Sequence, residues 1–259
     1  MVSLIVNMSN LSSTMKFKKT KRNSHGSIIE SLPSDLLIEV LTRVASSSYT
    51  DLFNAKLSCR NFLEASDDKF IMKNISIEKF PAIPWWQVKD EVSSFLKACK
   101  ESGNPEALYR QGMMEFFSWK KVESGEEYLK RAMEMEHMEA SYVYGIILLC
   151  KGGESNEEQG MKLLNAVKKS RKLGECRKKT KAFILSMWIR NPIVKCQELM
   201  NYHAKTCGRR NNGGIGGKRG WWQWIDDRED DEDKDVEEVN YCEGCMWEDE
   251  VSLFCKLFR

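Results

Sequence analysis

The seven residues EALYRQG at 106–112 recur 33 residues later as EASYVYG at 139–145. A second match pairs GEEYL at 125–129 with GMKLL at 160–164, 35 residues on. Small residues on one helix that face bulky residues on the next let two helices pack closely as a hairpin. A period of this length with this chemistry is typical of a helical solenoid. We therefore predict stacked helical hairpins, in preference to chance similarity between amphipathic helices.

Apolar residues recur at helical spacing through almost all of residues 87–205, and no segment is a convincing strand. Breakers such as SGNP and KGGESN separate the periodic stretches. Because roughly three hairpins are needed for a stable stack, we expect the outer helices to cap the two repeats. The chain is predicted to be all-α, with helices in this region near 87–101, 105–118, 124–135, 139–150, 157–169, 175–189 and 192–204.

The segment SDLLIEVLTRVA at 34–45 has more apolar surface than one neighbour can cover. At ~100° per residue its apolar side chains sweep roughly 200° of the helix, whereas a surface helix needs a stripe of about 100°. A second helix is predicted in DLFNAKLSCRNFLEAS at 51–66 and a third in DDKFIMKNI at 67–75. These two helices have enough material to cover one side only. We therefore expect an exposed apolar patch, and such patches mark interaction surfaces.

The sequences LPSDLLIEVLTRV at 32–44 and DLFNAKLSCRNFLEAS at 51–66 together resemble an F-box. Two features depart from the family pattern: ASSS at 45–48 stands where a Pro is frequent, and Phe62 replaces the usual Trp. The resemblance implies a three-helix unit that docks on the Skp adaptor of a cullin–RING ubiquitin ligase. The adaptor-binding residues that it implies are Leu32, Pro33, Leu36, Leu37, Val40, Leu41 and Val44.

The repeat region resembles Sel-type repeats, which are relatives of tetratricopeptide repeats. The usual Gly before the last Ala of that pattern is absent near His137, so the turn there is expected to differ. An F-box followed by such repeats and a Cys-bearing tail resembles a group of plant F-box proteins, some of which end in a MYND-type zinc finger. In such proteins the helical repeats would hold the substrate. Aromatic candidates for that contact are Tyr109, Phe116, Trp119, Tyr142 and Tyr144, although most aromatics at helical spacing belong to cores.

The C-terminal tail carries Cys242 and Cys245 at metal-knuckle spacing, with Cys255 further on. A structural zinc site needs four ligands, and Cys207, His203 or Cys196 would have to supply the fourth. We consider a zinc site on Cys242, Cys245, Cys255 and Cys207 together with a simpler interpretation. In that interpretation the tail is a degenerate remnant that packs on the repeats as a short amphipathic helix through Trp247, Val251, Phe254 and Leu257.

Several classes of function are disfavoured. No stretch approaches the ~18 apolar residues of a membrane span, and no Ser–His–Asp order, HExxH or P-loop motif suggests an enzyme. The nine cysteines, without an export signal, favour an intracellular protein with reduced thiols. WWQW at 221–224 is compatible with base stacking. However, an acidic run follows at 226–238. Ten of its thirteen residues are acidic and would repel phosphate.

These observations predict an F-box substrate receptor of an SCF-type E3 ubiquitin ligase that performs no chemistry itself. Its expected partners are the Skp adaptor, the cullin and a protein substrate, with no nucleic acid or membrane, in the cytoplasm, the nucleus or both. The alternative is a ligase-independent scaffold or nuclear regulator whose working part is the acidic tail or a zinc site. The predicted organisation is a disordered basic N-terminus at 1–27, an F-box at 28–77, a connector at 78–86, a helical-repeat substrate-binding domain at 87–205, a Gly-rich and acidic linker at 206–240 and a Cys-containing segment at 241–259.

Overall fold

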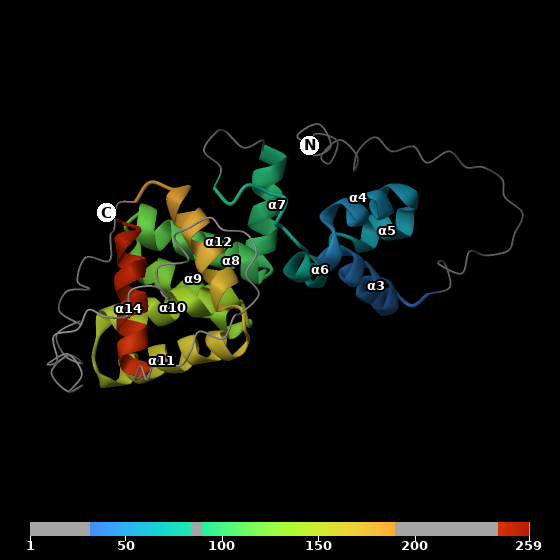
Figure 1. Ribbon diagram of the computed structural model, residues 1–259. Coiled ribbons are helices and arrows are strands. Elements are labelled where there is room, and N and C mark those ends of the chain that lie inside the picture. Colours follow the sequence, from blue (N-terminus) through green and yellow to red (C-terminus); the bar gives the residue numbers. More distant parts are fainter. Residues whose placement is uncertain (1–31, 84–89, 190–242, 259) are drawn as a thin grey trace, which may run out of the picture. The chain divides into compact units, whose positions relative to one another are not determined.

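The computed structural model describes residues 32–83, 90–189 and 243–258, and within these ranges every regular element is a helix (Figure 1). The all-α prediction is confirmed for this part of the chain. Residues 1–110 and 111–259 form two compact units, which are described separately below. The predicted helix near 192–204, the basic N-terminus and the linker at 206–240 lie outside the described residues.

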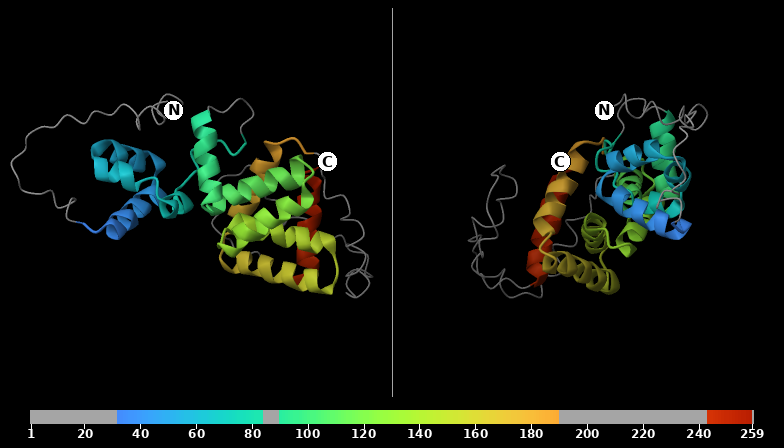
Figure 2. Two further views of the ribbon diagram at one scale, coloured as in Figure 1. Left: turned by 180° about the vertical axis from the view of Figure 1, so that it is seen from behind. Right: turned by 90° about the vertical axis from the view of Figure 1, so that its right-hand side faces the viewer.

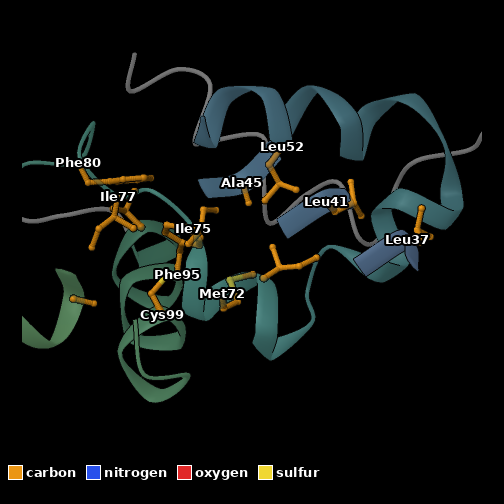
Figure 3. Packing of buried hydrophobic residues seen from close by; sticks show 13 residues of the cluster. Leu37, Leu41, Ala45, Leu52, Met72, Ile75, Ile77, Phe80, Phe95 and Cys99 are labelled. Atoms are coloured by element: carbon orange, nitrogen blue, oxygen red, sulfur yellow. The ribbon is translucent and has the colours of Figure 1, made fainter. Parts of the chain in front are cut away.

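The first unit begins with α3 (Ser34–Ser47), which follows the extended Pro33. Its residues Leu37, Leu41 and Ala45 are spaced by four, so they share one face of the helix. All three are buried in the core cluster of this unit, together with Leu52 and Met72 of the neighbouring helices (Figure 3).

The second predicted helix, over 51–66, is two helices in the structure. Helix α4 (Tyr49–Ser58) ends at Cys59, whose backbone is extended, and α5 (Arg60–Ala65) begins directly after it. The Cys59 Sγ atom accepts a hydrogen bond from the Phe62 backbone N–H at 3.5 Å, so Cys59 caps the new helix. The prediction of one continuous helix was wrong because a cap conformation at a single residue interrupts it. The predicted third helix is present as α6 (Lys69–Asn74).

The first unit continues beyond the predicted connector at 78–86. The rings of Tyr49 and Phe80 lie 4.9 Å apart, and each packs on Phe95 of α7 (Asp90–Glu101) at 5.3 and 5.2 Å. Burial raises the pKa of Tyr49 to about 12. The buried Asn104 side chain donates to the carbonyl oxygens of Met72 and Ile75, at 3.2 and 2.8 Å. Helix α7 therefore shares a core with the segment from α3 to α6, and the compact unit extends to residue 110.

Helix α8 (Pro105–Met113) starts in the first unit and continues into the second as a π-helical turn, η2 (Met114–Ser118). The second unit then contains α9 (Val122–Glu134), α10 (Met138–Lys151), α11 (Glu154–Lys169), α12 (Leu173–Leu185) and α14 (Glu243–Lys256). Helix α10 contacts α9, α11, α12 and α14, and it is buried continuously from residue 140 to residue 149. Figure 2 shows this central helix with its neighbours from two further directions.

The predicted repeat is visible as two equivalent helix contacts. A Cβ atom placed on Gly112 would lie 2.8 Å from Cγ of Leu129, and one placed on Gly145 would lie 3.0 Å from Cγ of Leu164. Each crossing also has a glycine on the partner helix. Gly112 faces the carbonyl oxygen of Gly125, and Gly145 faces that of Gly160. Both hairpins thus use a small residue where two backbones approach closely.

Three of the turns between these helices contain a left-handed residue that is not glycine, whereas the turn from α10 to α11 uses Gly152 and Gly153. Lys120, Glu136 and Arg171 have φ values of 58°, 61° and 58°. The turn near His137 was expected to differ because its usual Gly is absent, yet Glu136 adopts the conformation that a Gly favours. His137 then caps α10, since its Nδ1 accepts from the Ala140 backbone N–H at 3.2 Å.

Substitution of Gly125 by Ala is expected to destabilise the protein by about 1–3 kcal/mol. A Cβ atom there would lie 2.5 Å from the backbone N of Phe116, and backbone atoms cannot move aside cheaply. The free energy of unfolding measured by urea denaturation and circular dichroism tests this. The matched control is Gly174→Ala, also in a helix but with no atom within 4 Å of the new Cβ. It is expected to be neutral or slightly stabilising, and equal effects of the two substitutions would contradict the close-contact explanation.

Substitution of Glu136 by Gly is expected to raise the free energy of unfolding by up to about 1 kcal/mol, because it relieves a left-handed conformation that costs L-residues about 1–2 kcal/mol. Lys130→Gly, at an exposed position inside α9, is the control and is expected to lower it by about 1 kcal/mol. Thermal unfolding of the two variants measures the difference. A loss of stability in both variants would show that the left-handed residue carries no strain.

Candidate protein-docking surfaces

The first candidate surface is an apolar stripe on α3. Leu32, Leu36 and Val40 are spaced by four residues and are 37%, 48% and 51% exposed. Leu36 and Val40 are one turn apart on the same face of α3, whereas Leu32 lies just before the helix, next to Pro33. We call Leu32, Leu36 and Val40, with the exposed Pro33, the α3 stripe. Exposed large apolar side chains that gather at the start of one helix are a feature that proteins use for association.

The seven residues that the F-box resemblance implies for adaptor binding fall into two groups in the structure, one buried or half-buried and one exposed. Leu37 and Leu41 point into the core of their own unit (Figure 3), and Val44 is half-buried against it. The remaining four residues form the α3 stripe. Leu36 and Leu37 are ~100° apart around the helix, so adjacent leucines in the sequence face different neighbours. Of the seven residues, only the four of the stripe are therefore exposed for direct contact with a partner, and Leu37 and Leu41 belong to the core beneath them.

The second candidate surface lies on the repeat unit, where α14 packs. Its residue Glu250 is completely buried, with 0% of the side chain exposed. Tyr142 of α10 donates its hydroxyl to Glu250 Oε1 at 2.6 Å. Arg177 of α12 donates Nε to the same oxygen at 2.9 Å and also pairs with the second carboxylate oxygen through Nη2. A buried carboxylate requires such partners, so this cluster ties three helices together.

Apolar and aromatic contacts flank this cluster along α14. Trp247 is buried and donates Nε1–H to Asn165 Oδ1 of α11 at 3.2 Å. Phe254 is also buried, with its ring 6.2 Å from those of Phe117 and Tyr142. These contacts confirm the prediction of an amphipathic tail helix that packs on the repeats. Figures 1 and 2 show α14 (red) alongside α12 (orange).

The protonation states in this cluster follow from burial and charge. Burial, together with the nearby negative charge of Glu250, raises the pKa of Tyr142 well above its usual value. Burial alone would lower the pKa of the Arg177 guanidinium, but its hydrogen bonds and attraction to Glu250 outweigh that effect and raise the pKa. Tyr142 therefore stays a hydroxyl donor and Arg177 stays charged over the physiological pH range.

Four of the five aromatic residues considered for substrate contact are core residues. Tyr109, Phe116, Tyr142 and Tyr144 are all buried, which rules out direct contact with a partner at their present positions. Trp119 is 47% exposed, and Lys121 Nζ lies 5.8 Å from its ring centroid. The sequence did not single out Glu250 or Arg177, which the structure places at the centre of the second surface.

The zinc prediction stays a prediction. Cys207 and Cys242 lie outside the described residues, the side chain of Cys245 is not described, and Cys255 is disulfide-bonded. Within residues 32–83, 90–189 and 243–258 no three potential ligands form a metal-binding group.

Three thiols are poorly suited to nucleophilic chemistry. Burial raises the pKa values of Cys99, Cys150 and Cys176 to about 12, so at neutral pH they are protonated. Among the helices that the structure describes, none is both long and apolar enough to cross a membrane.

Comparison with known proteins agrees with both the α3 segment and the repeats. Residues 77–185 match the family model "Plant tetratrico peptide repeats". The chain is 31% identical over 211 residues to F-box protein At1g67623 of Arabidopsis thaliana, an assignment that its name marks as provisional. That match covers 79% of this chain and 69% of the relative.

F-box protein At2g35280 from the same plant is 27% identical over 48% of this chain and 75% of its own length. F-box protein At1g67340 is 25% identical over 58% of this chain and 42% of its own length. No solved structure matches. The chain belongs to the family of plant F-box proteins with helical repeats. The matched family model begins at residue 77, so the F-box assignment rests on the relatives and on the α3 segment.

Substitution of Tyr142 by Phe is expected to lower the free energy of unfolding by about 1.5–3 kcal/mol, because it removes a hydrogen bond to a buried charged group. Urea denaturation measures the loss. The control is the same substitution in a Glu250→Ala background, where the acceptor is already absent and the additional loss should be small. Equal losses in both backgrounds would show that the hydroxyl acts independently of Glu250.

Proposed function

We propose that the protein is a substrate receptor of an SCF-type ubiquitin ligase. In this proposal the α3 stripe docks on the Skp adaptor, which is bound to a cullin, and the repeat unit holds a protein substrate. The receptor itself catalyses no reaction, because it serves to bring the substrate close to a recruited conjugating enzyme. Such a complex would act in the cytoplasm, the nucleus or both.

The exposed α3 stripe is the observation that carries this proposal. Helix α3 buries one face in its own core and leaves Leu36 and Val40 exposed on another, with the exposed Leu32 just before it, so it has surface available for a partner. Fully burying a side chain of this size stabilises a complex by ~1.5–3 kcal/mol. The relatives named F-box proteins support the assignment of that partner as the Skp adaptor.

The charged residues beside the stripe contribute little to this binding. Glu39 and Arg43 form an i,i+4 ion pair at 2.7 Å, but their side chains remain 52% and 80% exposed. Exposed pairs of this kind contribute about 0–1 kcal/mol. The affinity of the proposed complex should therefore depend on apolar contacts and respond weakly to salt.

Simultaneous substitution of Leu36 and Val40 by Asp is expected to weaken binding of purified Skp adaptor at least 100-fold. The fold itself should persist, because both side chains are exposed in the isolated chain. Surface plasmon resonance or calorimetry gives the affinity, and circular dichroism verifies folding. Leu185→Asp is the matched control, since Leu185 is also exposed but belongs to the repeat unit, and it should leave adaptor binding unchanged. A folded double variant that binds the adaptor as the wild type does would refute the proposed docking surface.

A further inference from the structure

Helix α14 packs on the other helices of the repeat unit much as a helical peptide ligand would. Six of its residues are buried, and four of these, Trp247, Glu250, Val251 and Phe254, stand at positions i, i+3, i+4 and i+7, with Met246 and Leu253 beside them. This spacing is the pattern by which an amphipathic helix inserts its anchors into a groove on another protein. The sequence has 57 residues between α12 and α14, at 186–242, so α14 is not a neighbouring turn of the solenoid that short connections would force into place.

The receiving surface is made by α10, α11, α12 and η2 and contains specific polar partners. Tyr142 on α10 and Arg177 on α12 converge on the Glu250 carboxylate, and Asn165 on α11 accepts from the Trp247 indole. Phe117 of η2 receives the ring of Phe254 at the far end. The surface therefore offers three contacts. One is for an aromatic side chain that donates an N–H hydrogen bond, one is for a carboxylate and one is for a second aromatic ring.

We propose that this surface is a recognition site for a helical segment of a partner protein, and that α14 is its exchangeable occupant within the chain. The partner segment presents an aromatic residue, a Glu three positions later and a Phe four positions after that, in the register of Trp247, Glu250 and Phe254. If the repeat unit holds substrates as proposed above, this pattern defines the class of substrate that it accepts. The partner must displace α14 before it can bind.

The carboxylate gives this site its selectivity. Arg177 offers two donors to the two oxygens of one carboxylate, and Tyr142 adds a third. Fork-shaped pairs of this kind require both the charge and the planar geometry of the acceptor. A helix with Gln in place of Glu would remove the carboxylate charge from beside Arg177, whose side chain is only 14% exposed, and the loss of a mostly buried ion pair is unfavourable. The site therefore distinguishes an acidic helix from a neutral one of nearly the same shape.

Full-length protein with Trp247→Ala, Glu250→Ala and Phe254→Ala tests the exchange, because these changes remove the anchors of α14 and keep the receiving residues. The probe is a fluorescent peptide of residues 243–258 with Cys245→Ser and Cys255→Ser, used under reducing conditions because Cys255 is disulfide-bonded in the structure. Fluorescence anisotropy should show saturable binding to the variant. Binding to the wild-type chain should be at least 100-fold weaker, because a tethered competitor acts at an effective concentration of roughly millimolar.

Two further variants test the chemistry of the site. A probe with Glu250→Gln should bind the anchor-deleted chain about 100-fold more weakly. When the chain also carries Arg177→Gln, the Glu250→Gln probe should bind no more than about 10-fold more weakly than the Glu probe, because the two side chains act as a pair. A probe with Ser252→Ala, at a position that is only half-buried, is the control and should bind unchanged.

Three results would overturn the inference. The anchor-deleted chain could be unfolded by circular dichroism, in which case α14 is an integral part of the fold. It could be folded and fail to bind the probe, or it could bind both the Glu and the Gln probes equally. None of these results depends on the adaptor. Skp binding by the same chains, measured separately, therefore distinguishes failure of this site from failure of the proposed ligase function.

Discussion

The close approach of paired helices at glycine is the constraint on which the repeat unit depends. At Gly125 even a methyl group would collide with the backbone of η2, and at Gly145 it would press on Leu164. The second of these contacts holds α10 close to α11, and α10 also packs on α9, α12 and α14, so ten of its consecutive residues, 140–149, are buried. A helix buried all round must find partners for its polar side chains. Tyr142 finds its partner in Glu250, so the packing of the hairpins leads directly to the polar cluster under α14.

Sequence analysis correctly predicted the parts of the fold whose residues recur at regular spacing along the chain. The repeat at 106–112 and 139–145 places Gly112 and Gly145 at equivalent crossings. The apolar spacing of α3 likewise predicts a helix with two apolar faces. These patterns work because helix geometry relates residues three or four positions apart. The break at Cys59 escaped prediction because it depends on one cap conformation in an otherwise helical pattern.

The Glu250 cluster could not be predicted from the sequence for a different reason. Glu250 stands in the stretch MWEDEV, where three consecutive acidic residues lie between apolar ones, and such a charged run is usually a solvated face. Its partners are 108 and 73 residues away along the chain. Only Trp247, Val251 and Phe254 carried a local signal, and that signal correctly predicted an amphipathic helix against the repeats. The identity of the one buried acid among several required the tertiary contacts.

The two candidate surfaces differ in what they can discriminate. The α3 stripe consists of aliphatic side chains and a proline, which bind by burying area and accept many complementary apolar surfaces. The surface under α14 contains a buried ion pair with a hydroxyl donor. Buried ion pairs often add little net stability, because removing two charges from water costs about as much as their attraction returns. They penalise a wrong partner heavily, however, since either charge left alone is costly. If the protein is a substrate receptor as proposed, this difference suits the two tasks, with a permissive apolar surface for the adaptor and a charge-selective surface for the substrate.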